Sequence, residues 1–102
     1  MSIRKQYFKN KGICKVTFGV PASEGNAVGK ACLVGEFNNW STSATPMKRS
    51  KNGGFKASLD LKPGREYQFR YLLDDTRWDN DAEADKSSTT PFADARNSVI
   101  VL

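Results

Sequence analysis

The chain has 102 residues, of which 38% are hydrophobic and 26% are charged. That length accommodates about one ordinary domain, and the composition is that of a globular protein. No stretch approaches the roughly 20 apolar residues that a membrane-spanning helix needs, which predicts that the chain does not insert into a membrane. The N-terminus is charged from Arg4 onward and lacks the apolar segment of a signal peptide, so we expect a cytoplasmic protein.

The residues that are missing exclude much enzyme chemistry. The chain contains no histidine, so it lacks the commonest general base, the Ser-His-Asp triad and every histidine-containing zinc site. Cys14 and Cys32 each lie in an apolar run and are predicted to be buried, reduced thiols. Two cysteines cannot form a four-sulfur site, and neither a GxGxxG nor a GxxxxGK[ST] motif is present. No metal or nucleotide cofactor is expected.

The first half of the chain begins with a basic N-terminal arm, residues 1–12. Apolar and polar residues then alternate over 14–20, which predicts a strand with one face in the core. Residues 21–29 (PASEGNAVG) are rich in turn-forming residues and predict a loop. A short apolar run, 31–37 (ACLVGEF), follows and gives way to the polar segment 38–46.

The second half continues the strand pattern. Residues 55–61 form the clearest half-buried strand and are entered through an Asn-Gly-Gly turn at 52–54. Pro and Gly at 63–64 fit a type II turn, which leads into the strand 67–73. The aromatic residues of this strand share one face, so Arg70 is predicted to point away from the core.

A last strand is predicted at 97–102, and no segment has a persuasive helical period. Several short strands with turn signals about every ten residues indicate an all-β, antiparallel β-sandwich over residues 13–102. Residues 81–96 have no strand pattern and are longer than most loops in compact domains, which is often a sign of function.

Two tryptophans lie in polar surroundings near strand ends. Asn38 and Asn39 are expected to form the turn that ends the strand before Trp40. A hairpin turn in the segment 74–79 would place Trp78 at or beside the edge of a sheet. From the pattern alone, the rings either pack in the core, as most tryptophans do, or form an exposed aromatic platform.

The order of these motifs is similar to that of a known family. VGEFNNW, a GxF strand, a PG turn, the YQFRY strand, a WDND segment and a final NSVIVL together resemble the glycogen-binding modules. Such modules occur in the β-subunits of AMP-activated protein kinase and at the N-termini of isoamylases, pullulanases and glycogen-branching enzymes. The likeness covers residues 14–102. It implies an immunoglobulin-like (early-set) sandwich that binds α-1,4-glucan oligosaccharides or polysaccharides.

The resemblance also implies site residues. The family binds sugar through two tryptophans, a basic residue and an asparagine, which correspond here to Trp40, Trp78, Arg70 and Asn97. Phe92 is the expected counterpart of a leucine that braces the sugar. These types suit glucose, because indoles match its C–H face and a guanidinium matches its vicinal hydroxyls. The alternatives are a solvated cross-strand charge pair for Arg70 and an asparagine that satisfies its own backbone at position 97.

The acidic residues of segment 74–85 raise two further hypotheses. Glycoside hydrolysis needs two carboxylates on opposite sides of a bond, whereas these lie in one hairpin and loop. Calcium binding is disfavoured because the segment lacks the glycine and the final glutamate of an EF-hand loop. Solvated loop charge is therefore expected. A catalytic amylase barrel needs about 250 residues, so a link to glycoside hydrolases would be by association and no catalysis is expected.

The charge distribution supports rival functions. Residues 1–73 carry 13 Lys and Arg against 4 Asp and Glu, whereas residues 74–102 carry 3 against 7. Basic residues interleaved with aromatic ones could hold single-stranded nucleic acid, although an RRM-type signature is absent. Alternatively, the module has lost sugar binding and serves as a protein-interaction or regulatory module that contacts a separate glycogen-metabolising enzyme.

Overall fold

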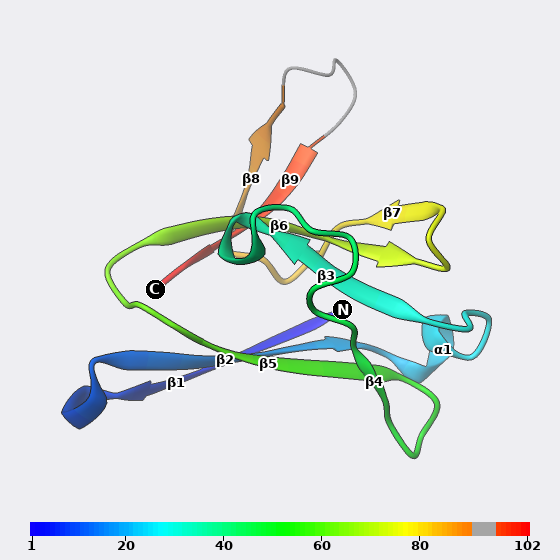
Figure 1. The fold of residues 1–102 in the computed structure, drawn as a ribbon, viewed down its shortest axis with the longest axis horizontal. Helices are drawn as coiled ribbons and strands as arrows, with labels where there is room; N and C mark the ends of the chain where they lie inside the picture. Colours follow the sequence, from blue (N-terminus) through cyan, green and yellow to red (C-terminus); the bar gives the residue numbers. More distant parts are fainter. Residues whose placement is uncertain (91–95) are drawn as a thin grey trace.

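Two antiparallel sheets pack face to face in a computed structural model that describes residues 1–90 and 96–102. Figure 1 shows them as a lower and an upper layer. The lower one, sheet A, has the strand order β1-β2-β5-β4, and the upper one, sheet B, has the order β3-β6-β9-β8. In sheet B, β9 pairs with the first half of β6 and β7 with the second half. The predicted all-β sandwich is confirmed.

The elements are short. The strands are β1 (Ser2–Phe8), β2 (Ile13–Val20), β3 (Ala31–Gly35), β4 (Lys48–Arg49), β5 (Phe55–Leu61), β6 (Glu66–Leu73), β7 (Arg77–Asp79), β8 (Lys86–Thr89) and β9 (Arg96–Val101). The helical turns are η1 (Lys9–Lys11), α1 (Ala22–Gly25) and η2 (Glu36–Asn38). Within the described residues, none of these helices is long and apolar enough to cross a membrane.

The core forms where the inner faces of the two sheets meet. Phe18 of β2 and Phe69 of β6 are fully buried, and their ring centroids lie 5.0 Å apart in an edge-to-face arrangement. Tyr71 extends this aromatic contact, with its ring 5.7 Å from that of Phe69. The odd-numbered positions of β6 therefore face inward, as predicted. Arg70 consequently lies on the outer face of sheet B.

Two edge strands depart from the sequence-based expectations. Residues 1–12, expected as a basic arm, contain β1, which pairs with β2 along its whole length. The absence of a strand in 81–96 is a wrong prediction, because residues 86–89 form β8 at the edge of sheet B. Its sequence, KSST, is entirely polar. An edge strand with so little buried surface shows no apolar alternation.

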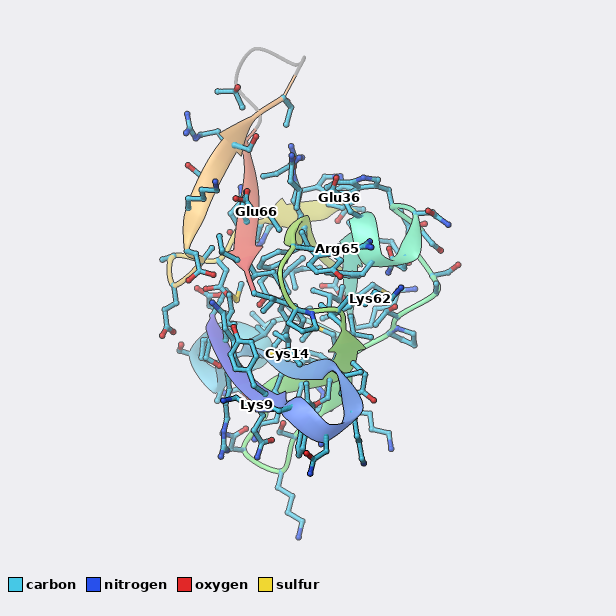
Figure 2. The ribbon with its side chains drawn as sticks, turned by 90° about the vertical axis from the view of Figure 1, so that its left-hand side faces the viewer. Lys9, Cys14, Glu36, Lys62, Arg65 and Glu66 are labelled. Carbon is cyan, nitrogen blue, oxygen red and sulfur yellow. The ribbon has the colours of Figure 1, made fainter. Side chains whose placement is uncertain are left out.

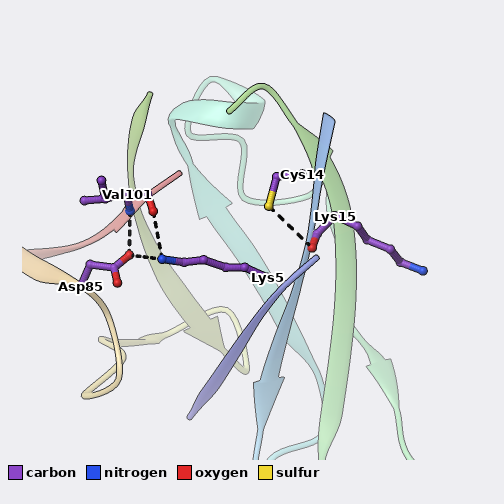
Figure 3. Close-up of polar contacts among 5 residues, drawn as sticks. All are labelled: Lys5, Cys14, Lys15, Asp85 and Val101. Atoms are coloured by element: carbon purple, nitrogen blue, oxygen red, sulfur yellow. Dashed lines mark hydrogen bonds and ion pairs between the residues drawn. The ribbon is translucent and has the colours of Figure 1, made fainter. Parts of the chain in front are cut away.

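The side chain of Lys5 ties the N-terminal strand to sheet B (Figure 3). Its Nζ donates to Oδ2 of Asp85 at 2.6 Å and to the carbonyl oxygen of Val101 at 2.9 Å. Oδ2 of Asp85 also accepts the backbone N–H of Val101 at 2.7 Å. Burial alone raises the pKa of Asp85, but these hydrogen bonds and the charge of Lys5 outweigh it and hold the pKa below its ordinary value.

Substitution Asp85→Asn is expected to lower the free energy of unfolding by about 1 kcal/mol at pH 7, a small value because the pair is partly exposed to solvent. A carboxyl whose pKa is lowered by folding stabilises the folded state at pH values above its unfolded pKa of about 3.9. This stabilisation is lost as the pH falls through the pKa of the folded state. Urea unfolding should therefore show the difference at pH 7 and a smaller one near pH 2. An equal difference at both pH values would contradict this assignment.

Candidate functional site

A cavity of about 420 Å³ opens on the outer face of sheet B. Its lining residues are Glu36, Trp40, Gln68, Arg70, Trp78, Thr90 and Asn97. The fold therefore brings together four of the five predicted site residues, although they come from the turn after η2 and from β6, β7 and β9. The fifth, Phe92, lies outside the described residues.

The turn after β3 places Trp40. Oδ1 of Asn38 accepts the backbone N–H of Gly35 at 3.1 Å, and its Nδ2 donates to Oγ1 of Thr45 at 3.0 Å. Asn39 and Trp40 then adopt positive φ angles of 56° and 59°. The left-handed conformation costs an L-residue such as tryptophan about 1–2 kcal/mol. The structural role predicted for the two asparagines is confirmed, and Trp40 is held in a strained position beside the sheet.

The β6–β7 hairpin places Trp78. Asp74 and Asp75 have φ angles of 53° and 61°, as the two central residues of a type I′ turn require. Trp78 then pairs with Leu72 at the edge of sheet B. The side chains of Trp40 and Trp78 are 40% and 46% exposed, so neither ring is buried in the core. The exposed arrangement is the correct one of the two alternatives left by the sequence.

A small apolar cluster lies on the same outer face of sheet B. Cys32, Val34 and Leu72 are buried there, separately from the main core. Leu72 is the register partner of Cys32 on one side and of Trp78 on the other. Burial raises the pKa of the Cys32 thiol, and both cysteines are free and buried, as predicted. Trp78 thus lies next to an apolar surface formed by this cluster.

A row of hydrogen bonds runs through the cavity. Nε of Arg70 donates to Oδ1 of Asn97 at 2.6 Å, and Nδ2 of Asn97 donates to Oε1 of Gln68 at 2.8 Å. The backbone N–H of Gln68 donates to Oε1 of Glu36 at 2.6 Å. Since a guanidinium has donors only, Asn97 must present its oxygen to Arg70. Arg70 therefore determines the amide orientation of Asn97, and Gln68 in turn presents its oxygen to Nδ2 of Asn97.

This row corrects two alternatives from the sequence. Arg70 contacts a neutral amide rather than a charged cross-strand partner, and Asn97 bonds to Arg70 and Gln68 rather than to its own backbone. Nε is used in the contact with Asn97, and no hydrogen bond joins the terminal amino groups of Arg70 to any residue that the structure describes. Four N–H donors of Arg70 therefore remain for a ligand.

Three lining residues were not predicted from the sequence: Glu36, Gln68 and Thr90. Gln68 had a usable signal, because it shares the outward parity of Arg70 two positions later on the same strand. Glu36 lies four residues before Trp40 at the start of the same turn, so its place near the Trp40 ring could also have been inferred. Thr90 follows an edge strand without any pattern, and nothing in the sequence marked it.

The acidic residues of segment 74–85 hold the fold together instead of forming a reaction centre. Oδ1 of Asp74 accepts the backbone N–H of Gly29 at 2.8 Å, and Oδ2 of Asp81 accepts the hydroxyl of Tyr71 at 2.7 Å. Glu36 is the one carboxylate among the described residues that line the cavity. Over the same part of the chain, no group of three or more His, Cys, Asp or Glu residues could hold a metal ion.

A small β-sandwich with exposed indoles beside a polar row is the arrangement expected of a carbohydrate-binding module, because indoles cover the C–H face of a sugar. Residues 23–99 match the family described as the glycogen recognition site of AMP-activated protein kinase. The chain belongs to this family, which confirms the resemblance seen in the sequence. Over 49 residues, or 48% of the chain, it is also 39% identical to Protein PTST homolog 2, chloroplastic, from Arabidopsis thaliana. The matched part is 9% of that protein's length.

Proposed function

We propose that the chain binds α-1,4-linked glucans in this cavity without cleaving them. Glucose units stack on Trp40 and Trp78, and their hydroxyls bond to Arg70 and Asn97. The observation that carries the proposal is that two half-exposed tryptophans, 38 positions apart in the sequence, line one cavity together with these polar groups. Family membership supports the same ligand class.

The two kinds of side chain match the two surfaces of a sugar. One face of a glucose ring carries only C–H groups, which an indole covers well. If each indole loses about 100 Å² of apolar surface, burial contributes about 2.5 kcal/mol per ring. Association and ordering cost much of this, so we expect dissociation constants between about 1 mM and 1 µM for oligosaccharides.

The polar row supplies both donors and acceptors to the hydroxyl rim. The free N–H groups of Arg70 form a planar fork that fits two neighbouring hydroxyls. Glu36 uses Oε1 for the backbone of Gln68, and its Oε2 remains available as an acceptor. A sugar hydroxyl both donates and accepts, so this combination can satisfy it in either direction.

Titration with maltoheptaose and with β-cyclodextrin tests the proposal, with the indole N–H signals followed by NMR. The chain has two tryptophans, so single substitutions assign both signals. Both should shift on binding, and the dissociation constant should change less than about twofold between 0.05 and 0.5 M NaCl because the ligand is neutral. The proposal fails if neither signal moves, or if affinity falls steeply with salt.

Absence of hydrolysis is part of the proposal. Hydrolysis of a glycosidic bond uses two carboxyl groups placed across the bond, whereas Glu36 is alone among the described residues that line the cavity. The purified chain should release no reducing sugar from glycogen. Release that disappears in a Glu36→Gln variant would overturn this part.

Gln68 offers a test of the polar row with two substitutions at one position. Gln68→Glu keeps an acceptor for Nδ2 of Asn97, so maltoheptaose affinity should stay within about threefold. Gln68→Lys offers only donors, which turns the Asn97 amide and leaves two donors facing each other at Arg70. The affinity should then fall about tenfold, a loss of about 1.4 kcal/mol. Equal affinities of the two variants in the same titration would contradict this role.

A further inference from the structure

The outer face of sheet A, on the other side of the sandwich from the cavity, is strongly basic. Its strands present Arg4, Lys15, Lys48 and Lys56, and the adjoining turns add Lys9, Lys11 and Lys51. We call these seven residues the basic face. Asp60 is the one acidic residue at an outward position of these strands. In Figure 2, Lys9 lies at the sheet A end of the molecule and Glu36, from the cavity, at the opposite end.

The cations of the basic face are not neutralised by the protein. Elsewhere, acidic groups neutralise basic side chains in four ion pairs: Lys5–Asp85, Lys30–Asp75, Arg77–Asp79 and Lys86–Glu66. None of the seven cations of the basic face forms an ion pair with a residue that the structure describes. The positive charge of the chain is therefore concentrated and uncompensated on one side.

Two lysines of the basic face lie directly opposite each other, which destabilises the fold, and no acidic residue of the described chain pairs with either of them. Lys48 of β4 and Lys56 of β5 are direct register partners in sheet A. Like charges directly opposite each other in a sheet are destabilising. A ligand that brings negative charge to this point would relieve the repulsion.

Two hollows mark where such a ligand would lie. One, of about 390 Å³, has Lys48, Lys56, Thr17 and Ser58 in its lining. The other, of about 380 Å³, is lined by Lys11, Lys15 and the same Ser58, together with the carboxylate of Asp60 and the apolar side chains of Phe8 and Ile13. They meet at Ser58, whose hydroxyl is 3.0 Å from that of Thr17. Together they form a track of ammonium and hydroxyl groups across the strands, which the carboxylate of Asp60 interrupts at one point.

We propose that the basic face docks an acidic segment of a partner protein, an extended stretch with several Asp or Glu residues. Its carboxylates accept hydrogen bonds from the lysine ammonium groups and from the hydroxyls between them. The complementary charge attracts the segment and sets its position along the track. Because this face belongs to the other sheet, the chain can hold a glucan and an acidic segment at the same time.

The same features disfavour nucleic acid as the occupant. Binding of single strands uses aromatic platforms on which bases stack. Phe8 lies on this face, but Nζ of Lys11 lies 5.8 Å from its ring centroid and covers it, and both tryptophans lie on the other sheet. Asp60 is the register partner of Lys15 and would repel a continuous phosphate backbone. A peptide can place an uncharged side chain beside Asp60, whereas a nucleic acid carries a phosphate at every nucleotide.

The test uses a fluorescent peptide of about 16 residues with alternating Glu and Ser, titrated by anisotropy at about 0.05 M NaCl, where surface charges are weakly screened. The double variant Lys48→Glu/Lys56→Glu should bind it at least about tenfold more weakly. The control is Lys62→Glu/Arg65→Glu, which makes the same charge change at two exposed residues in the turn between β5 and β6 (Figure 2). Its affinity should change less than about twofold.

A third variant, Lys48→Glu, separates binding from folding. It places a carboxylate opposite Lys56, so its melting temperature should equal or exceed that of the parent chain while peptide affinity falls. Maltoheptaose binding should be unchanged in all three variants, so that a failure here is distinct from a failure of glucan binding.

Three results would overturn the proposal. The first is no saturable peptide binding. The second is an equal loss of peptide affinity in the test and control double variants, which would indicate that the peptide is attracted to the net positive charge of the chain and not to the basic face. The third is tighter binding of an oligothymidylate of the same net charge, lost on Lys48→Glu/Lys56→Glu, which would assign the face to nucleic acid.

Discussion

Alanine at position 78 is expected to weaken maltoheptaose binding by about 50-fold. The estimate follows from the loss of about 100 Å² of apolar contact at about 25 cal/mol per Å², or about 2.5 kcal/mol. Trp78 is 46% exposed and lies over no part of the main core, so the fold should survive its removal. Isothermal titration of the parent and the variant measures the difference.

At position 40, glycine separates the loss of the indole from damage to the fold better than alanine does. Its φ of 59° lies in the left-handed region, which glycine adopts without strain. Trp40→Gly removes the indole and relieves the backbone, so glucan affinity should fall by a similar factor of about 50 while the melting temperature does not drop. Loss of binding in this variant cannot be attributed to a damaged fold.

Tyr7→Ala is the matched control for both tryptophan substitutions. Tyr7 is 52% exposed but lies in β1, next to the β1–β2 turn and away from the cavity. Its removal should leave maltoheptaose affinity unchanged. If Tyr7→Ala reduces the affinity as much as the tryptophan variants, or if those variants bind within threefold of the parent, the stacking proposal is wrong.

The sandwich could be predicted where burial leaves a period-two pattern. Strands β2 and β5 bury one face and leave much of the other open to solvent, and β6 sets an aromatic inner face against a half-buried outer face with Gln68 and Arg70, so apolar and polar residues alternate along them. The turns that precede Trp40 and Trp78 were predictable for a different reason, although the pattern left the exposure of the two rings open. Both follow turns whose Asn and Asp residues tolerate positive φ, which is a local property of the sequence.

Contacts between distant strands could not be predicted in the same way. The bond between Arg70 and Asn97 depends on the pairing of β6 with β9, and alternation does not state which strands are neighbours. The edge strand β8 was missed because its side chains are polar and it needs only one partner strand. In each case the missing information was which strands lie next to each other in the sheet.

Asp81 is the clearest error of the sequence-based interpretation, which treated it as solvated loop charge. It is 5% exposed, and its backbone N–H donates to Oγ of Ser98 at 2.8 Å. Oγ of Ser98 in turn donates to Oδ1 of Asn80 at 2.8 Å. This network attaches the loop after β7 to β9, one residue from Asn97 in the cavity. A charged residue in a polar segment carries no local sign that it is buried.

The substitution Tyr71→Phe should therefore lower the free energy of unfolding by about 3 kcal/mol, because it leaves Oδ2 of the buried Asp81 carboxylate without its donor, while Oδ1 keeps the backbone N–H of Glu83. The hydroxyl of Tyr71 donates to Oδ2 of Asp81 at 2.7 Å, and the ring is fully buried. Tyr67→Phe is the control. Among the residues that the structure describes, the Tyr67 hydroxyl bonds to the backbone of Lys62 alone, at 3.2 Å, near the surface. Its loss should cost about 1 kcal/mol or less.

The pH dependence of the same variant gives an independent check. Burial, together with the negative charge of Asp81 and the hydrogen bond to it, raises the pKa of Tyr71 well above its ordinary value of 10.0. The neutral phenol therefore stabilises the folded state fully below pH 10, and this contribution declines by about 1.4 kcal/mol per pH unit above it, because the unfolded tyrosine ionises first. Tyr67 and Tyr7 are common to both proteins, so urea unfolding at pH 9, 10 and 11 isolates Tyr71. The parent chain should lose stability over that range more steeply than Tyr71→Phe, and parallel curves would show that the hydroxyl of Tyr71 is not held in the core.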